Sequence, residues 1–308
     1  MSKTADNAVG RWPSILTGIG FPAEALVNKH GPCPLGCGGK KSFRFDDKER
    51  RGTWICSHCG AGEGVELVKQ FLQVDARAAL KRIDELLPQA IESKAAPVRD
   101  RSGVRRAMNA LWGEAYPVGD IGGAVAEYLT RRLGFVPQGT GLRYSTGVDY
   151  YDADRLKVGR FPAMLASVIS PKDEFVGLHR TYLTRDGEKA PVDAPKKLMT
   201  CVESIAGSAI RLGRADGAVL GVAEGIETAL AASRRFVTPV WATISAAGME
   251  SFIPPSHVRH VDIYADHDTN GQGQLSAYKL MNRLVLKDKI SAAVHIPHRA
   301  GTDWADPQ

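Results

Sequence analysis

The sequence predicts a protein of mixed α+β and α/β class, in which a small cysteine-bearing module precedes a linker and a larger region ending in a parallel sheet. Three observations predict this class. Four of the five cysteines cluster within residues 33–59, residues 88–103 are rich in Pro, Ala, Ser and mixed charge, and about the last hundred residues alternate between strand-like and helix-like segments. A chain of 308 residues, 44% of them hydrophobic, is long enough for two domains and a small third.

Charge and hydropathy narrow the possible function classes. Forty Lys and Arg residues against 34 Asp and Glu residues give a net charge of +6, and the pI is near 9.0, which favours an anionic partner such as nucleic acid. No run approaches the roughly 18 apolar residues that span a bilayer, and the first residues lack the apolar segment of a secretory signal. We therefore expect a cytoplasmic protein with no membrane partner, in which clustered cysteines bind metal rather than form disulfides.

The predicted first domain, residues 1–87, holds the cysteine cluster and a helical run, GVELVKQFLQVDARAALKRIDELL. The cysteines follow the pattern Cys-x3-Cys, an excursion of 18 residues, then Cys-x2-Cys. Four thiolates from two short turns supply the tetrahedral sulfur set that Zn²⁺ takes in closed structural sites. The segments SFRF and TWIC are expected to form a hairpin between the two turns. The pattern predicts a zinc ribbon with four ligands: Cys33, Cys37, Cys56 and Cys59.

Basic and aromatic residues are interleaved around this predicted ribbon. Residues 29–51 contain seven basic against three acidic side chains, with Phe43, Phe45 and Trp54 in and next to this stretch. Such a face could hold a single strand by phosphate attraction and base stacking. A solvated face around an aromatic mini-core fits the same residues, so the sequence leaves both interpretations open. His30 and His58 are expected to face solvent or DNA rather than to bind the zinc.

The region after the cysteine module is expected to begin with a linker at 88–103, followed by a basic part at 104–213 and a parallel-sheet domain at 214–308. In this last domain we expect four strands, with helices between several of them: AVLGVAEG, VTPVWATIS, HVDIYAD and SAAVHIP. Such βαβ order predicts a parallel sheet with helices on both faces. Ligands of such sheets bind at the carboxyl ends of the strands.

Acidic residues follow two of these predicted strands. Glu224 ends the first, and Asp266 and Asp268 follow another two positions apart, so they are expected to point the same way. Carboxylates that converge at strand ends form an oxygen-rich site for a hard cation such as Mg²⁺ or Mn²⁺. His267 is expected to be structural, and Glu227, one turn into a helix, to complement the helix dipole.

Three sequence blocks resemble known families. In order and spacing, GVAEGIETAL, IYADHDTNGQG and GTDWADP resemble the acidic motifs of the Toprim fold shared by primases, topoisomerases and some nucleases. The cysteine cluster followed by GTWICSHCGAGEGVELV looks like the zinc-binding domain of bacterial and phage primases. The stretch GLHRTYLTRDGEKAPVDAPKKLM, with AIRLG after it, is similar to the core segment that precedes Toprim in phage and plasmid primases.

The resemblance implies roles for individual residues. The metal-binding catalytic acids of the family fall on Glu224, Asp266, Asp268 and Asp303. The basic residues that hold nucleotide or template fall on Arg180, Lys197 and Arg143. The implied metals are a structural Zn²⁺ and a catalytic Mg²⁺ or Mn²⁺.

The function implied by the resemblance is that of a DNA primase, which makes short RNA primers from ribonucleoside triphosphates on a single-stranded DNA template for phage, plasmid or mobile-element replication. Because the chain ends just after DWADP, a replicative helicase is expected as a separate chain. Two alternatives remain open: a Toprim-type metal-dependent nuclease, and a non-enzymatic, zinc-dependent regulator that binds single-stranded DNA. A topoisomerase needs a tyrosine nucleophile and a large gate. It is disfavoured because the 308 residues show no sign of such a gate.

Overall fold

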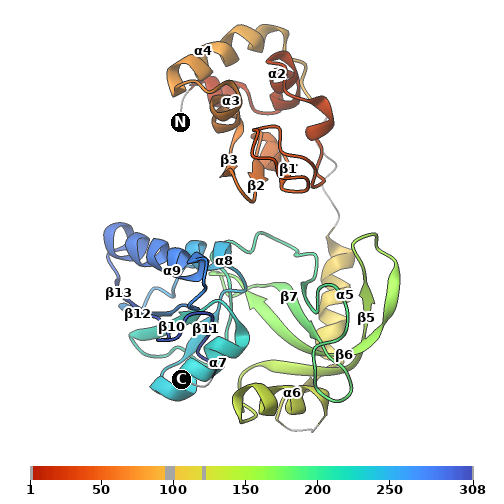
Figure 1. The fold of residues 1–308 in the computed structure, drawn as a ribbon, viewed down its shortest axis with the longest axis vertical. Coiled ribbons are helices and arrows are strands. Elements are labelled where there is room, and N and C mark those ends of the chain that lie inside the picture. Colours follow the sequence, from red (N-terminus) through yellow and green to blue (C-terminus); the bar gives the residue numbers. More distant parts are fainter. Residues whose placement is uncertain (1–2, 94–100, 120–122, 307–308) are drawn as a thin grey trace. The chain divides into compact units, whose positions relative to one another are not determined.

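The computed structural model describes residues 3–93, 101–119 and 123–306 (Figure 1). The chain divides into two compact units, Met1–Arg99 and Asp100–Gln308. No helix in the described part of the chain is long and apolar enough to cross a bilayer.

The first unit is a small three-stranded sheet with helices before and after it. The strands β1 (Phe43–Phe45), β2 (Trp54–Cys56) and β3 (Gly60–Gly62) pair antiparallel in that order. The helices and helical turns of this unit are α1 (Lys3–Asn7), α2 (Trp12–Gly18), η1 (Ala23–Ala25), η2 (Lys48–Arg50), α3 (Gly64–Leu72), α4 (Ala76–Leu86) and η3 (Leu87–Gln89). The expected hairpin and trailing helical run are confirmed, and the run is two helices that break at residues 73–75.

The aromatic residues of the ribbon form its core. Phe43, Phe45 and Trp54 are at most 3% exposed, and the rings of Phe43 and Trp54 stack with centroids 5.9 Å apart. Trp12 and Phe21, from the preceding segment, pack into the same cluster. The mini-core interpretation is therefore right, and base stacking on these rings is excluded because their faces are covered by protein.

The expected linker at 88–103 differs from the structure at both ends. The amide of Ile91 donates to Ser14 Oγ, and Ser93 Oγ donates to the carbonyl of Gly10, so the chain is attached to the first unit as far as residue 93. The next helix, α5, already begins at Ser102. Residues 94–100, the middle of the expected linker, lie outside the described residues.

The second unit contains one ten-stranded sheet with an antiparallel and a parallel half. Its first half comprises α5 (Ser102–Gly113), β4 (Tyr116–Pro117), α6 (Ala124–Leu133), β5 (Leu142–Tyr151), β6 (Lys157–Ile169), β7 (Phe175–Tyr182), β8 (Lys196–Leu198) and β9 (Ala209–Ile210). All pairs within this half are antiparallel. The short strand β9 joins the halves, because it pairs with β6 on one side and with β11 on the other.

The second half confirms the expected βαβ order. It comprises β10 (Val219–Ala223), α7 (Ile226–Phe236), β11 (Val240–Ala242), α8 (Ala246–Ser251), β12 (His260–Tyr264), α9 (Gln272–Arg283), η4 (Leu284–Asp288) and β13 (Ser291–His295). Strands β11, β10, β12 and β13 lie parallel in that order.

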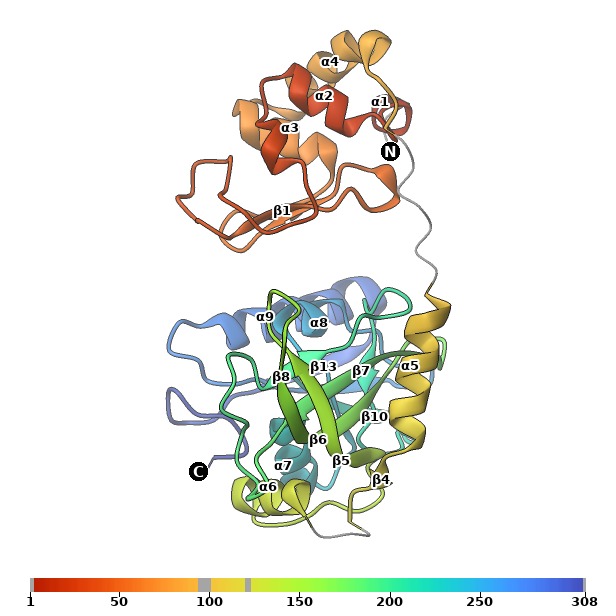
Figure 2. The ribbon, with the colours of Figure 1, turned by 90° about the vertical axis from the view of Figure 1, so that its right-hand side faces the viewer.

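Two apolar clusters cover the faces of this parallel half. One contains Ala223 and Tyr264 with residues of α7, and the other contains Val222 and Ile263 with residues of α8 and α9. Because successive strand residues point to opposite faces, α7 covers one face and α8 and α9 cover the other (Figure 2). Helices bury both faces of this half of the sheet. A ligand can therefore reach it at the carboxyl ends of its strands.

Candidate metal and nucleotide site

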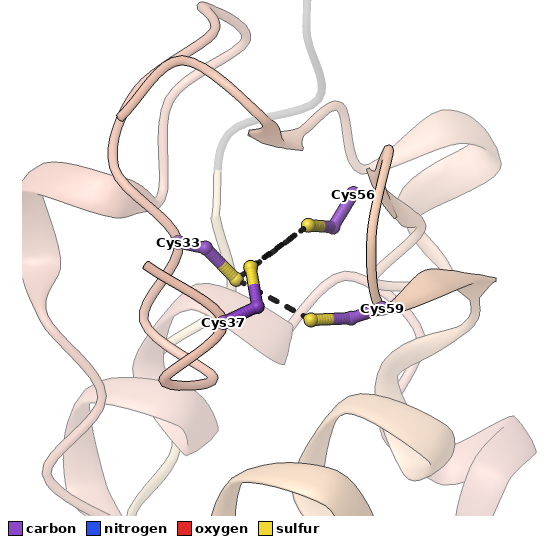
Figure 3. A group of neighbouring side chains, drawn as sticks. All are labelled: Cys33, Cys37, Cys56 and Cys59. Carbon is purple, nitrogen blue, oxygen red and sulfur yellow. Dashed lines mark hydrogen bonds between the residues drawn. The ribbon is translucent and has the colours of Figure 1, made fainter. Parts of the chain in front are cut away.

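The four cysteines of the ribbon come together as one sulfur cluster (Figure 3). Cys33 and Cys37 precede β1, Cys56 ends β2, and Cys59 directly precedes β3. Their Sγ atoms lie 3.6 Å (Cys56 to Cys33), 3.7 Å (Cys33 to Cys59) and 3.7 Å (Cys37 to Cys56) apart. A tetrahedral ion about 2.3 Å from each sulfur requires edges of about 3.8 Å. The cluster therefore fits a structural Zn²⁺, and the structure brings together the four cysteines that the sequence predicted as its ligands.

The carboxylates expected at the strand ends leave the sheet at one edge. Glu224 follows β10 and Asp266 follows β12 closely, and the last residues of these neighbouring parallel strands, Ala223 and Tyr264, are paired in register. Burial raises the pKa of Asp266 to about 7, and the negative charges of Asp303, Glu224 and Asp268 add to this effect. Burial raises the pKa of Glu224 as well, with the charge of Asp268 in the same direction. The three acids therefore act on one another electrostatically.

Local hydrogen bonds hold two of these carboxylates. The amide of Gly273, in the first turn of α9, donates to Asp268 Oδ2 at 2.9 Å, which places a negative charge at the positive end of that helix. Thr228 Oγ1 donates to Asp266 Oδ1 at 3.4 Å. A Cβ atom at position 273 would lie 2.9 Å from the carbonyl oxygen of Asp266, so only glycine leaves this edge undisturbed.

The acids form a wider set of donors than the cysteines. In the described part of the chain, the cysteines are the one group of at least three metal-ligating side chains whose ligand atoms all lie within 4.8 Å of one another. Mg²⁺ keeps several waters and is usually bound by one or two carboxylates together with substrate phosphates. Half-buried, mutually repelling oxygen donors that do not form so tight a cluster fit such a hydrated cation.

Asp303, the fourth expected acid, is held by an arginine. Arg132 Nη2 lies 2.6 Å from Asp303 Oδ2, and Arg132 Nη1 lies 2.5 Å from Asp306 Oδ1. The amide of Ala305 donates to the other oxygen of Asp303. Asp303 therefore lies in an ion pair with Arg132, and its negative charge still raises the pKa of Asp266.

The basic residues expected to hold nucleotide or template stack on aromatic rings. Lys197 Nζ lies 4.0 Å from the ring centroid of Tyr150 and donates to the carbonyl of Tyr151. The guanidinium of Arg180 lies 5.5 Å from the ring centroid of Tyr182. In the ladder between β7 and β8, Arg180 and Lys197 are opposite each other, so they share one face of that pair of strands.

Arg143 also lies on an aromatic ring. Its guanidinium is 4.6 Å from the ring centroid of Trp112 and donates to the carbonyl of the same residue. This contact ties β5 to α5. His267, expected to be structural, bonds through its ring to the carbonyl of Pro297 and through its amide to the carbonyl of Thr302, which fixes the loop before Asp303.

Lys196, which we did not expect from the sequence, faces the acids instead of Lys197. Its Nζ lies 2.8 Å from Oε2 of Glu227, and Tyr128 donates a 2.5 Å hydrogen bond to Oε1 of the same carboxylate. Burial opposes ionisation of Glu227, yet the charge of Lys196 and the two hydrogen bonds lower its pKa to about 2. The charge of Lys196 also opposes the rise that burial and Asp268 cause in the pKa of Glu224. Lys196 therefore brings a cation to the carboxylates that follow the carboxyl ends of β10 and β12, Glu224, Asp266 and Asp268, which we call the acidic edge.

The fold and these two centres define a protein that combines a primase-type zinc ribbon with a Toprim domain. Residues 28–65 match the family described as the zinc-binding domain of primase-helicase, and residues 219–307 match the Toprim domain. Residues 102–212, between them, match a domain family of unknown function, DUF7146.

Several solved primase structures are similar to this chain. The zinc-binding and RNA polymerase domains of the Aquifex aeolicus primase are 13% identical, with 99% of this chain and 81% of that chain covered and a TM-score of 0.44. The primase fragment of the bacteriophage T7 primase-helicase is 12% identical, with 90% and 92% covered and a TM-score of 0.38. The RNA polymerase domain of the Mycobacterium tuberculosis primase is 15% identical, with 66% and 74% covered and a TM-score of 0.41.

Proposed function

We propose that this protein is a DNA primase that makes short RNA primers on single-stranded DNA by metal-dependent nucleotidyl transfer, in phage, plasmid or mobile-element replication. The observation that carries the proposal is the set of mutually repelling carboxylates Glu224, Asp266 and Asp268 at one sheet edge of a Toprim domain, in a chain with a primase-type four-cysteine ribbon. Its proposed partners are template DNA, ribonucleoside triphosphates and a replicative helicase.

The acidic edge would hold a divalent cation. Bound Mg²⁺ or Mn²⁺ would offset the negative charge of the nucleotide phosphates and of the attacking 3′ oxygen. Glu224, Asp266 and Asp268 supply the oxygen ligands, and the Gly273 amide keeps Asp268 in place. The chain itself needs no side-chain nucleophile, because the primer hydroxyl attacks the phosphate.

Lys196 is the residue we assign to the nucleotide phosphates. Its ammonium is held beside Glu224 by Glu227, and its side chain is 40% exposed, so a phosphate can reach it. Lys197 and Arg180 lie on the other face of the β7–β8 pair, and Arg143 lies on β5. For these three residues a contact with the template backbone fits better than a contact with the nucleotide.

Primer synthesis is the direct test. The protein is incubated with single-stranded DNA of varied sequence, labelled ribonucleotides and Mg²⁺ or Mn²⁺, and products are resolved by size. We expect Asp266→Ala to lower product formation at least about 100-fold, since it removes a ligand of the charge-neutralising cation. Asp216→Ala removes an exposed carboxylate paired with Arg214 and serves as the matched control. Equal activity of Asp266→Ala and wild type, with the fold intact, would overturn the proposal.

The same reaction mixture separates primase from nuclease. A metal-bound carboxylate site of this kind also supports phosphodiester cleavage, which consumes no nucleotides. Labelled template that shortens without added nucleotides would indicate a nuclease. Binding of DNA with neither synthesis nor cleavage would indicate a zinc-dependent regulator.

A further inference from the structure

A groove lined by arginines lies between the last turns of α6 and α7, outside the acidic edge. It has a volume of about 650 Å³ and runs past Leu133–Phe135 and the C-terminal loop at Trp304–Asp306. Four arginines line it, two from the last turn of each helix: Arg131, Arg132, Arg234 and Arg235.

Two of these arginines are held by carboxylates. Arg131 Nη1 lies 3.1 Å from Glu188 Oε1, and Arg132 forms the short ion pairs with Asp303 and Asp306. Even when all three acids are counted, 4 − 3 leaves the groove with a charge of +1. The positive charge that remains belongs to the two arginines of α7.

Arg234 and Arg235 are exposed and have no ion-pair partner among the residues that the structure describes. The guanidinium of Arg234 lies 4.3 Å from the ring centroid of Phe135, and that of Arg235 lies 5.4 Å from the ring centroid of Trp304. Stacking on a ring holds a planar guanidinium in place while its N–H groups stay free to donate at the edges.

The groove offers one further side-chain donor, from the indole of Trp304. Trp304 Nε1 is buried and has no hydrogen-bond partner within the described residues. Arginines in the last turn of a helix complement the helix dipole, and that role alone explains the charge. It does not explain why the two guanidinium groups are fixed on aromatic rings along a groove. Fixed donors without acceptors fit a ligand that brings phosphate oxygens.

We propose that this groove binds the phosphates of a single nucleic-acid strand that extends beyond the acidic edge. The assignment of the ligand as a nucleic-acid strand rests on the proposed function, since α7 begins next to Glu224 of the acidic edge and ends at the groove. Eleven helical residues at about 1.5 Å each span about 16 Å, or at most about five nucleotides at about 3.4 Å or more each.

Binding of labelled DNA tests the groove without catalysis. Fluorescence anisotropy with a 12-nucleotide and a 3-nucleotide strand, without added divalent ion, compares wild type with Arg234→Ala/Arg235→Ala. We expect about tenfold weaker binding of the 12-mer, and a salt dependence shallower by about 1.4 in log–log slope, since each lost phosphate contact removes about 0.7. The 3-mer, too short to reach both sites, is expected to lose less than twofold.

A matched control removes the same charge elsewhere in the second unit. Arg214→Ala/Lys287→Ala also lowers the net charge by two, at exposed positions outside the groove. We expect a less than twofold effect on the 12-mer from this control, and an unchanged thermal midpoint for both double variants. Equal losses in the two double variants, or an unchanged 12-mer affinity and salt slope in Arg234→Ala/Arg235→Ala, would overturn the inference.

Two further measurements separate the sources of phosphate and the two proposals. Labelled ATP alone is expected to bind both double variants as it binds wild type. If Arg234→Ala/Arg235→Ala lost ATP binding but kept 12-mer binding, the groove would be a nucleotide site and the assignment of a nucleic-acid strand would be overturned. Wild type that makes no primers, while Arg234→Ala/Arg235→Ala loses 12-mer binding, would refute the primase proposal and leave the groove standing. Primer synthesis by wild type, with unchanged 12-mer binding in Arg234→Ala/Arg235→Ala, would refute the groove proposal and leave the primase proposal standing.

Discussion

Lys196 and Glu227 form an ion pair, 2.8 Å from Nζ to Oε2, in which the carboxylate is almost fully buried and the ammonium is partly open to solvent. This pair joins β8 of the antiparallel half to α7 of the parallel half. Through the hydroxyl of Tyr128 it also reaches α6. The pair therefore ties together the elements that surround the acidic edge.

The buried carboxylate of this pair is expected to matter for stability. Glu227→Gln keeps an acceptor for Tyr128 but removes the charge that faces Lys196, so we expect a loss of about 2 kcal/mol in the free energy of unfolding. Urea unfolding followed by circular dichroism measures it. Lys279→Met breaks an exposed ion pair with Glu250 and should cost less than about 1 kcal/mol. A Glu227→Gln midpoint equal to wild type would contradict a stabilising role.

The two adjacent lysines of β8 give a second prediction. We expect Lys196→Ala to raise the KM for ribonucleotides about tenfold or more, because one charge-assisted contact with phosphate is worth about 1.5–3 kcal/mol. Lys197→Ala, on the opposite face of the strand, is expected to leave this KM within about twofold of wild type. Steady-state primer synthesis at varied nucleotide concentration distinguishes them, and a larger effect at position 197 would return the nucleotide role to Lys197.

How far the sequence predicts this site depends on the residue. Spacing was enough for the cysteines, because a four-thiolate centre is assembled from two short local turns. The order of strands and acids along the sequence was enough to place Glu224 and Asp266 near each other, because neighbouring parallel strands have their carboxyl ends on the same side of the sheet. Lys196 was missed because β8 is three residues long, and alternation in so short a strand gives no signal of which lysine lies on the face towards Glu227.

Long-range pairing explains the other differences. Glu227 was expected to complement a helix dipole, and its burial depends on Tyr128 and Lys196, which lie 99 and 31 positions away. The role of Phe43 and Trp54 was ambiguous until their packing against the preceding helices was known. The sequence pointed to Asp303 as an acid of the site. It gave no indication of its partner Arg132, which lies 171 positions earlier.

Zinc removal is expected to unfold the ribbon. The first unit has a small core, and in such domains the metal-binding free energy is folding free energy. We expect one zinc ion per chain by elemental analysis, none in the ribbon of Cys59→Ser, and loss of the protected environment of Trp54 in its fluorescence. His58→Ala should keep its zinc, because this exposed histidine lies outside the sulfur cluster. Zinc loss in His58→Ala with retention in Cys59→Ser would contradict the assignment of four cysteine ligands.

His179, on β7, predicts how stability depends on pH. Burial lowers the pKa of its imidazole to about 4, and the charge of Lys196 acts in the same direction, while Glu227 opposes it. The unfolded chain, with a histidine pKa of 6.5, therefore binds more protons than the fold between pH 6.5 and 4. Stability is present in full above pH 6.5 and is lost as the pH falls through this window, by up to about 3 kcal/mol. Urea midpoints between pH 7.5 and 4 measure the loss, and His179→Leu should make it smaller by that amount, whereas an equal slope in both proteins would exclude His179 as its source.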